Sequence, residues 1–339
     1  GDDTAPLILA TNKRNITYYP VRHENEAIAM ADGYQRATGR IGVCTVTGGP
    51  GICNGLTALV TANRGNSRIV VLSGTGRPAE DDLDPGVIRK ATPAGWLKWF
   101  PHGTTLGGLG IKTYRPQNAG EVIPDTRAAL LHAENGPSVL VYGRELIFGA
   151  ADTSALAKPA PKAPPPKVPD PEQINQLADL LQETWAINRP LIIGGRGAMN
   201  GGAGPALRRL GELTGALMAT SLPANGLFYD DPFNVGVCGT YSNPVASELI
   251  PQADCVLAFG AALNIMTTYN NTMFPKAMLV HVDHAPAKFG VFMDPELTLE
   301  ADVKLTAEAL VAELERRGHQ TQGFRTDETR ATIAAFDKA

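Results

Sequence analysis

The sequence carries no surplus of positive charge. It contains 30 lysine and arginine residues against 34 aspartate and glutamate residues, which gives a net charge of −4 at pH 7. A protein that binds along a nucleic acid or an anionic membrane needs an excess of basic side chains to neutralise phosphates. The charge balance therefore argues against nucleic acid and membrane surfaces as partners.

Paired cysteines and long apolar runs are also missing. Because Cys44, Cys53, Cys238 and Cys255 are never spaced as CxxC, we expect reduced, packed thiols rather than disulfides or metal ligands. No apolar stretch reaches the roughly 18 residues needed to cross a bilayer, and the first residues lack the basic and apolar segments of a signal peptide. These absences predict a cytoplasmic location.

Proline, in contrast, is concentrated in one segment. Residues 155–171 read ALAKPAPKAPPPKVPDP, and repeated proline removes backbone donors and favours an extended spacer. A chain of 339 residues is also long for a single hydrophobic core. We therefore expect a first domain over residues 1–154, a proline-rich linker over 155–172, a second domain over 173–320 and a polar tail over 321–339.

Short β-rich runs alternate with helical stretches on both sides of this linker. In the first half we predict strands over residues 16–19, 42–46, 68–72 and 138–142, helices over 24–38 and 119–134, and a tight or mobile loop over 103–110. In the second half we predict strands over residues 190–194, 254–259 and 278–282, and helices over 205–214 and 305–317. The pattern predicts an α/β protein with two doubly wound parallel-sheet domains, the second of them Rossmann-like.

A carboxylate stands where the first strand-like run gives way to a helix. The simplest interpretation of Glu24 is a capping interaction, because the free amides and the dipole of a first helical turn favour negative charge. A second turn, TGGPG over residues 47–51, also leaves a strand and enters a helix. Glycines let the backbone approach a ligand closely, and ligands of open α/β sheets bind outside the carboxyl ends of strands. The carboxylate and the glycine turn can therefore share one crevice.

Taken together, these residues resemble a known family. The pattern RHE, then A-x-x-x-A-x-G-Y-x-R-x-T-G, then G-G-P-G-x-x-N is similar to the pyrimidine-binding domain of thiamine-diphosphate enzymes, and acetolactate synthase-like enzymes are nearest. The matching positions are His23, Glu24, Ala27, Ala31, Gly33, Tyr34, Arg36, Thr38, Gly39, Gly49, Pro50, Gly51 and Asn54. In the second half, PLIIGGRGA, TGALMATSLPANGLF and ADCVLAFGAALN resemble the central domain of the same family, so the resemblance covers nearly the whole chain.

The resemblance implies part of a thiamine-diphosphate-dependent decarboxylase or carboligase, a lyase or transferase, that acts on a 2-oxo acid. It makes Glu24 the catalytic carboxylate, which hydrogen-bonds or protonates N1′ of the aminopyrimidine so that the exocyclic nitrogen can remove the thiazolium C2 proton. Pro20, Thr47, Pro50 and Asn54 match positions that line the cofactor's pyrimidine pocket. Each of these four also has a plain interpretation as a turn or capping residue.

The other end of the cofactor has no counterpart in the sequence. Family members hold the diphosphate and Mg²⁺ in a further domain, through a Gly-Asp-Gly turn and a later Asn. Neither GDG nor a Walker-type GxxxxGK[ST] occurs in this sequence, so we assign no metal ligand and expect the Mg²⁺ ligands outside the chain. The implied partner is a diphosphate-binding domain or subunit, within a homo- or hetero-oligomer. Either the enzyme is naturally split, or the chain is a piece of a longer protein that also lacks an opening strand and helix.

FAD is possible but not favoured as a second cofactor. A glycine turn at a helix start can bind a pyrophosphate, and GGRG occupies residues 194–197. This turn falls short of GxGxxG, however, and GAA over residues 260–262 replaces the GAR that is common in FAD-binding relatives.

The activity itself stays open at the level of sequence. EDDLDPG, over residues 80–86, stands near the place where acetolactate synthase-like relatives carry a Phe-Gln pair beside the active site. The nearby Trp96, Trp99, Phe100 and His102 are either pocket lining or local packing. A thiamine-diphosphate-dependent C–C hydrolase or acyl transferase is one alternative. A non-catalytic α/β binding or regulatory homologue is the other.

Overall fold

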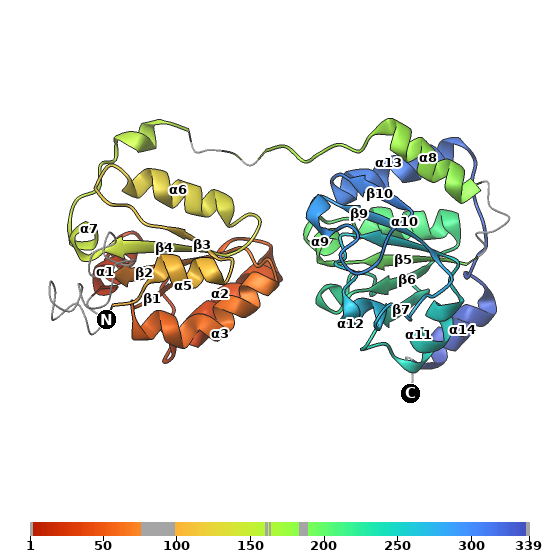
Figure 1. The fold of residues 1–339 in the computed structure, drawn as a ribbon, viewed down its shortest axis with the longest axis horizontal. Helices are drawn as coiled ribbons and strands as arrows, with labels where there is room; N and C mark the ends of the chain where they lie inside the picture. Colours follow the sequence, from red (N-terminus) through yellow and green to blue (C-terminus); the bar gives the residue numbers. More distant parts are fainter. Residues whose placement is uncertain (1–2, 76–98, 160–161, 163, 183–188, 337–339) are drawn as a thin grey trace. The chain divides into compact units, whose positions relative to one another are not determined.

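A computed structural model describes residues 3–75, 99–159, 162, 164–182 and 189–336 of the protein. The chain divides into two compact units, Gly1–Pro164 and Pro165–Ala339. Figure 1 shows that each unit is a sheet with helices on both faces. The division falls inside the segment predicted as a linker, and the domain boundaries on either side of it stay a prediction.

The first unit is built on a four-stranded parallel sheet with the strand order β1-β2-β4-β3. Its elements are α1 (Ala5–Lys13), α2 (Glu24–Thr38), β1 (Gly42–Val46), α3 (Pro50–Arg64), β2 (Ile69–Thr75), α5 (His102–Gly108), β3 (Lys112–Tyr114), α6 (Val122–His132), β4 (Ser138–Gly143) and α7 (Arg144–Phe148), followed by a 3-10 turn over Ser154–Ala157.

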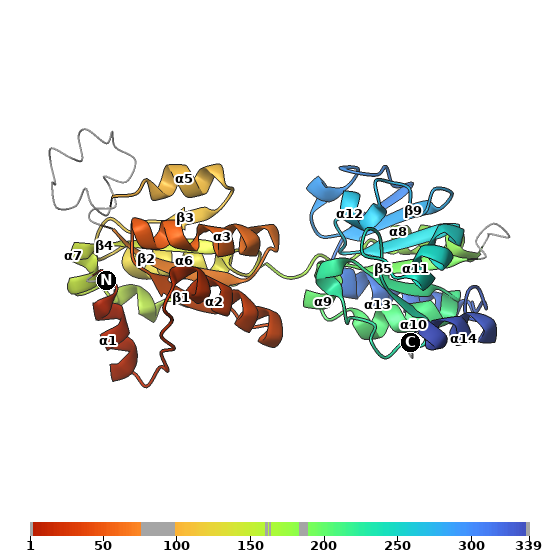
Figure 2. The ribbon, with the colours of Figure 1, turned by 90° about the horizontal axis from the view of Figure 1, so that it is seen from below.

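Alternating side chains of the central strands give this sheet two apolar faces. Val139 and Val141 of β4 pack against α2, α3 and α5, whereas Leu140 and Tyr142 pack with α6 and with partly buried residues of α1 and α7. Successive side chains of a strand point to opposite faces, so a strand covered on both sides is apolar throughout. Figure 2 shows α2 and α3 lying next to each other beside this sheet.

The second unit contains a six-stranded parallel sheet with the order β10-β9-β8-β5-β6-β7. Its helices and strands are α8 (Pro171–Gln182), β5 (Pro190–Gly194), α9 (Arg196–Asn200), α10 (Gly204–Thr214), β6 (Leu217–Thr220), β7 (Asn234–Val237), α11 (Pro244–Leu249), β8 (Cys255–Phe259), α12 (Ile265–Thr268), β9 (Met278–Asp283), β10 (Leu297–Glu300), α13 (Val303–Arg316) and α14 (Asp327–Phe336), with 3-10 turns over Leu222–Ala224, Ile250–Gln252 and Pro286–Lys288.

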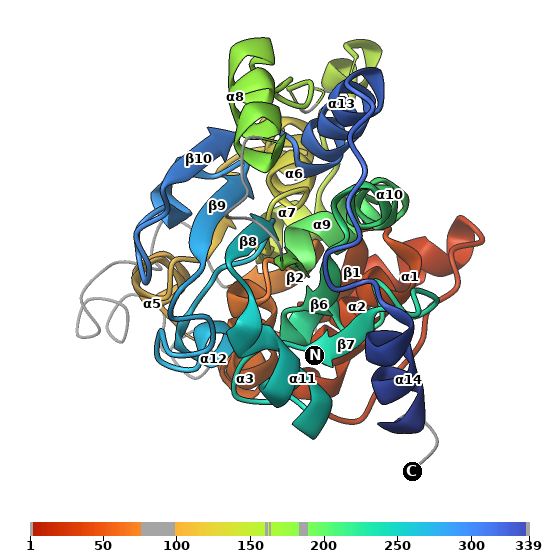
Figure 3. The same cartoon turned by 90° about the vertical axis from the view of Figure 1, so that its right-hand side faces the viewer.

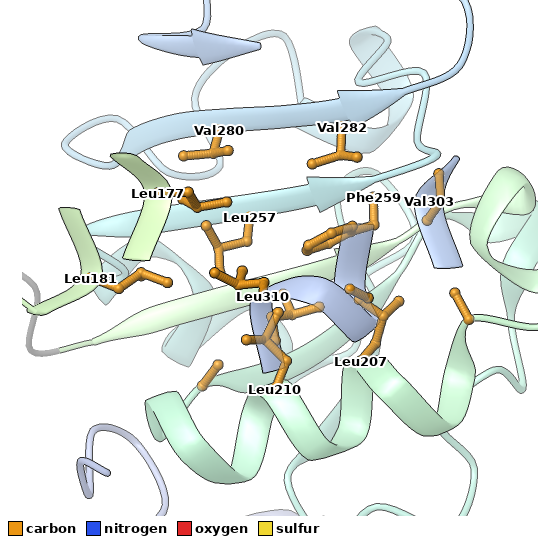
Figure 4. Close-up of a cluster of buried hydrophobic side chains, with 14 of the residues drawn as sticks. Leu177, Leu181, Leu207, Leu210, Leu257, Phe259, Val280, Val282, Val303 and Leu310 are labelled. Atoms are coloured by element: carbon orange, nitrogen blue, oxygen red, sulfur yellow. The ribbon is translucent and has the colours of Figure 1, made fainter. Parts of the chain in front are cut away.

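One face of this sheet is covered by α8, α10 and α13, and the other by α11 and α14 (Figure 3). Phe274 is buried in the core on the α11 side. Figure 4 shows the first of these cores, in which Leu257, Phe259, Val280 and Val282 of the strands meet Leu177, Leu207 and Leu310 of the helices. Both faces of the central strands are fully buried, as a parallel sheet with helices on both sides requires. The predicted α/β class, with two parallel-sheet units, is confirmed.

Residues after α13 pack onto the second unit, although the sequence predicted only a polar tail there. Phe324 and Ile333 are buried against the α11 face of the sheet. Arg325 donates to Asp231 at 2.9 Å and to the carbonyl of Ala216 at 2.9 Å, and its guanidinium lies 4.9 Å from the centre of the Phe233 ring. These contacts join residues 324–336 to the unit that precedes them.

Two element predictions were wrong. Residues 16–19 form no strand, and Ile16 and Tyr19 are exposed, because a β-rich run becomes a strand only where a neighbour supplies hydrogen bonds. Residues 102–108 form α5 rather than a loop, because Leu106 is fully buried in the core and tertiary packing outweighs the poor helix propensity of glycine. The segment 80–86 and Trp96 lie outside the described residues.

Phe100 and His102 belong to the core of the first unit rather than to a pocket. Phe100 is buried and lies edge-on to the His102 ring at 5.0 Å, and Nε2 of His102 is 3.3 Å from the hydroxyl of Ser73. Across the described parts of the chain, no helix combines the length and the hydropathy needed to cross a bilayer.

Candidate functional site

The local sequence explains why α2 begins at Glu24. His23 adopts an extended conformation before the helix, and its Nδ1 accepts the backbone N–H of Asn25 at 3.2 Å. Glu24 and Glu26 place negative charge in the first turn, where the unpaired amides and the helix dipole favour it. The helix ends at Gly39, whose φ of 69° is the left-handed conformation that favours glycine. The predicted range of this helix, residues 24–38, is confirmed.

The glycine turn leads from the end of β1 into α3. Gly49 has a φ of 61° and a ψ of −113°, a conformation that side chains with a Cβ rarely adopt, and Pro50 follows as the first residue of the helix. Because proline lacks an N–H and has its φ fixed near the helical value, it suits this position. The turn therefore brings the start of α3 to the carboxyl end of β1.

Glycines on α3 let it approach α2 closely. A Cβ at Gly51 would lie 2.4 Å from Cγ2 of Thr47 and 3.3 Å from Oε1 of Glu24, and a Cβ at Gly55 would lie 2.6 Å from Cδ1 of Ile28. The backbone N–H of Ala58 also donates to the side chain of Asn25 at 2.9 Å. The starts of both helices therefore lie together, with the Glu24 carboxylate next to Gly51.

Asn54 completes this arrangement. Its Nδ2 donates to Oε2 of Glu24 at 3.1 Å, across 30 residues of sequence. This hydrogen bond is the main reason that the pKa of Glu24 lies below its ordinary value, with a second contribution from hydrogen bonding by the Glu24 backbone. Partial burial opposes the shift, and His23 adds to it. The structure thus presents an ionised, partly exposed carboxylate at neutral pH.

The hydroxyl of Thr47 binds Asp3. It donates to Oδ1 and Oδ2 of Asp3 at 2.5 and 2.7 Å, and the backbone N–H of Gly48 donates to Oδ2 of Asp3 at 2.8 Å. The side of Thr47 that faces Gly51 is therefore its methyl group, Cγ2. Asp3 was not predicted as a site residue, because 44 residues separate it from Thr47 and no motif includes it.

The structure brings most of the predicted site residues together. Glu24 and Asn54 are in direct contact, Thr47 reaches the same point from β1, and Pro50 starts α3 one residue before Gly51. Pro20 is exposed in the segment before α2, and three residues separate it from Glu24. The roles assigned to these residues stay predictions. The expectation of four packed thiols was wrong for Cys53, which is exposed on α3 next to Asn54.

The residues present fit an aminopyrimidine. An ionised carboxylate suits a ring nitrogen that carries or exchanges a proton. A side chain at position 51 would stand between the Thr47 methyl and the Glu24 carboxylate, so glycine keeps this carboxylate accessible. Within the described ranges, no three His, Cys, Asp or Glu side chains are grouped so that they could hold a metal ion.

The glycine turn of the second unit, residues 194–197, packs against the turn that follows β8. The N–H of Gly195 donates to the carbonyl of Phe259 at 2.8 Å, and the N–H of Gly197 donates to the carbonyl of Gly260 at 3.0 Å. A Cβ at Gly195 would lie only 2.0 Å from the oxygen of Gly260. Close packing of two neighbouring turns therefore accounts for this glycine, and both amides are already paired with backbone.

Two family models match the chain. The N-terminal TPP binding domain of thiamine pyrophosphate enzymes matches residues 1–94, and the central domain of thiamine pyrophosphate enzymes matches residues 174–310. The first match contains Glu24, Thr47 and Asn54, and the second contains β5 to β10.

Curated relatives agree with these matches. A probable acetolactate synthase large subunit of Methanocaldococcus jannaschii is 28% identical over 331 residues, which cover 93% of this chain and 52% of that protein. Acetolactate synthase 1, chloroplastic, of Oryza sativa subsp. japonica is 29% identical over 315 residues, 90% of this chain and 46% of that protein. A probable 2-ketoarginine decarboxylase of Pseudomonas aeruginosa is 29% identical over 342 residues, 99% of this chain and 58% of that protein.

The chain thus spans about half the length of the curated relatives it matches. The two matched domain types, the two parallel sheets and the relatives named acetolactate synthase all lead to one family. This chain belongs to the thiamine pyrophosphate enzymes and comprises their N-terminal and central domains.

Proposed function

We propose that the chain supplies the aminopyrimidine-activating part of a thiamine-diphosphate-dependent enzyme that acts on a 2-oxo acid. The observation that carries the proposal is the contact of Glu24 with Asn54 beside Gly51. A carboxylate that only capped α2 would need neither a contact with Asn54 of α3 nor a glycine at position 51. The retained carboxylate and glycine turn also favour an enzyme over a non-catalytic homologue.

In this proposal Glu24 is the catalytic residue. Its carboxylate would accept a hydrogen bond from a protonated N1′ of the aminopyrimidine, because the lowered pKa of Glu24 keeps the carboxylate ionised at neutral pH. Asn54 donates to Oε2 and thereby orients the carboxylate and stabilises its ionised form. When bound, thiamine diphosphate supplies an electron sink at the carbonyl carbon of the substrate.

The remaining predicted residues form the surroundings of the ring. Thr47 contributes its methyl group on the side of Gly51. Pro50 is an exposed apolar side chain at the start of α3, and Pro20 is an exposed apolar side chain in the segment before α2. Apolar walls with few polar groups are typical of cofactor sites, because the polar groups alone fix the orientation. We assign Pro20, Thr47 and Pro50 to binding rather than to chemistry.

Diphosphate and Mg²⁺ are bound, in this proposal, by a domain or subunit outside these 339 residues. The sequence has no GDG turn, and the relatives are about twice as long as the aligned part. The complete site then requires an oligomer or a longer chain. We also propose that no FAD binds the turn at Gly195, because the amides of Gly195 and Gly197 already donate to the backbone.

The names of the relatives guide the choice of substrate. One is a probable 2-ketoarginine decarboxylase, and others are acetolactate synthases. We therefore propose a 2-oxo acid as the donor, with decarboxylation or carboligation as the reaction.

Calorimetry tests the division of the cofactor between two protein parts. Thiamine diphosphate with Mg²⁺ is titrated into the chain alone, and then into the chain mixed with a diphosphate-domain partner. We expect weak binding by the chain alone and much tighter, Mg²⁺-dependent binding by the pair, because both ends of the cofactor are then held together. Tight, Mg²⁺-dependent binding by the chain alone would contradict this division.

A further inference from the structure

Asp3 accepts hydrogen bonds from two donors in the turn between β1 and α3. The Thr47 hydroxyl donates to Oδ1 and Oδ2 of Asp3 at 2.5 and 2.7 Å, and the N–H of Gly48 donates to Oδ2 at 2.8 Å. One carboxyl group thus binds a side chain and a backbone amide of consecutive residues. Asp3 therefore holds the turn at two consecutive residues.

The surroundings of Asp3 are built around it. Its side chain is only 8% exposed, although aspartate is rarely buried unless it is paired. At the end of β2, a Cβ at Gly74 would lie 2.5 Å from Cβ of Asp3, and at Gly48 a Cβ would lie 1.9 Å from the oxygen of Gly74. The two strand ends and Asp3 are therefore packed too closely for side chains at positions 48 and 74.

This contact selects the rotamer of Thr47. Because the hydroxyl is committed to Asp3, the methyl group points to Gly51, and Cγ2 lies 2.4 Å from the point where a Gly51 Cβ would be. Oε1 of Glu24 lies 3.3 Å from the same point. The methyl and the carboxylate therefore border one small space. In the alternative rotamer, a hydroxyl could donate to Glu24 and compete with a ring nitrogen for its carboxylate.

We propose that Asp3 is a positioning residue of the cofactor site, which holds Thr47 with its methyl group, and not its hydroxyl, beside the Glu24 carboxylate. This role rests on the proposed function of Glu24. Asp3 touches neither the cofactor nor the substrate in this account. It acts through the Thr47 rotamer.

The first measurement follows the contact itself in the full chain, by hydrogen exchange at the Gly48 amide. Removing the acceptor with Asp3→Ala should accelerate this exchange several-fold to about tenfold, the factor expected for one net hydrogen bond. The amide of Val71, in the buried middle of β2, is the internal reference for global stability, and its exchange should accelerate less than that of Gly48. Asp3→Asn keeps one acceptor oxygen and should restore part of the protection. Unchanged exchange at Gly48 in Asp3→Ala would overturn the proposal.

The second measurement separates positioning from folding, in the enzyme completed with its diphosphate-binding part. We expect Asp3→Ala to raise the KM for thiamine diphosphate about tenfold and to change kcat less than twofold, because a freed hydroxyl competes for Glu24. Thr47→Val has no hydroxyl to misplace, so adding Asp3→Ala to it should leave KM unchanged. A purely structural role would lower the amount of active enzyme without this dependence on residue 47.

The outcomes distinguish failure of the proposed function from failure of the role of Asp3. If turnover of the parent enzyme does not depend on thiamine diphosphate, the proposed function fails, and this role fails with it. If turnover depends on the cofactor but Asp3→Ala leaves its KM unchanged, only the role of Asp3 fails. Should Asp3→Ala not fold, Asp3→Asn and Thr47→Val provide the same comparison, and additive effects of these two substitutions on KM would contradict the proposal.

Discussion

Adding one methyl group at Gly51 should disturb the site through crowding alone. In Gly51→Ala the new Cβ would lie 2.4 Å from Cγ2 of Thr47 and 3.3 Å from Oε1 of Glu24. Carbon atoms normally pack about 3.5–4.0 Å apart, so the contact with Thr47 is short by more than about 1 Å. Thr47 cannot rotate away without breaking its hydrogen bonds to Asp3. The backbone of α3 must therefore shift, and the Glu24 carboxylate must shift with it.

The expected cost can be measured against a matched control. Gly33 lies in the middle of α2, and a Cβ there would meet nothing within 4 Å. Gly33→Ala should therefore stabilise the chain by about 0.5–1 kcal/mol through the lower backbone entropy of alanine. Gly51→Ala gains a similar helical contribution but adds overpacking of about 1–3 kcal/mol. The free energies of unfolding of the two variants should thus differ by about 1–3 kcal/mol, with Gly51→Ala the less stable.

Urea unfolding of both variants measures this difference, and cofactor titration of the completed enzyme measures the effect on the site. Gly51→Ala should also weaken thiamine diphosphate binding, whereas Gly33→Ala should leave it unchanged. If Gly51→Ala were as stable as Gly33→Ala and bound the cofactor normally, Thr47 would have to move freely. That result would refute both the crowding argument and the fixed rotamer.

Three other predictions follow from the titrating groups and the thiols. Asn54→Ala should raise the pKa of Glu24 toward its ordinary value in a ¹³C-NMR titration. Because the folded-state pKa of Glu24 is lowered, ionised Glu24 stabilises the fold above its unfolded pKa, and this contribution is lost as the pH falls through the folded pKa. The free energies of unfolding of the parent and of Asn54→Ala should therefore differ less in acid than at neutral pH. An unmoved pKa would exclude the Asn54 hydrogen bond. A thiol reagent should modify exposed Cys53 first, although the raised pKa of Cys53 slows the reaction at neutral pH. Cys238 and Cys255 are buried, with pKa values of about 12, and should react only on unfolding. Early labelling of either buried thiol would contradict its packing. The completed enzyme should show no visible flavin absorbance, and FAD should not raise its melting temperature; a stoichiometric yellow cofactor would overturn this expectation.

The elements that were predicted correctly are those with clear signals in their local sequence. The helix over Glu24–Thr38 has a cap, an acidic first turn and a terminal glycine. The strand over Gly42–Val46 lies between this terminal glycine and the glycine turn that leads into α3. Each of these signals acts within a few residues, so the sequence pattern is enough to place the element.

The errors arose where tertiary contacts decide the structure. The run over residues 16–19 has the composition of a strand but pairs with no other strand, and α5 forms despite its glycines because Leu106 is buried. The strands β6, β7 and β10 were not predicted at all. Their positions in the sheet depend on neighbours far away in the sequence, such as the pairing of Leu217 with Leu191.

The same distinction between local signals and long-range contacts applies to the candidate site. The sequence predicted that the Glu24 carboxylate and the glycine turn share one crevice, and the family motif added Asn54 to the pocket lining. It did not predict their direct hydrogen bond, because no local rule relates residues 30 positions apart. Asp3 lies 44 residues from Thr47 and outside any motif, so the sequence offered no signal for it. Asp3 is recognised only in the folded chain, as a buried carboxyl group that accepts hydrogen bonds from two donors of a neighbouring turn.

Turnover by Glu24→Gln shows whether Glu24 is the catalytic carboxylate. The substitution preserves the shape of the side chain but removes the group that exchanges a proton with the cofactor ring. Glu26→Gln, which changes an exposed carboxylate in the same first turn of α2, is the matched control. With saturating thiamine diphosphate, Mg²⁺ and a 2-oxo acid, we expect Glu24→Gln to reduce kcat of the completed enzyme by about 10²–10⁴-fold, and Glu26→Gln to retain activity within a few-fold. Activity of a folded Glu24→Gln enzyme within a few-fold of the parent would contradict the assignment of Glu24.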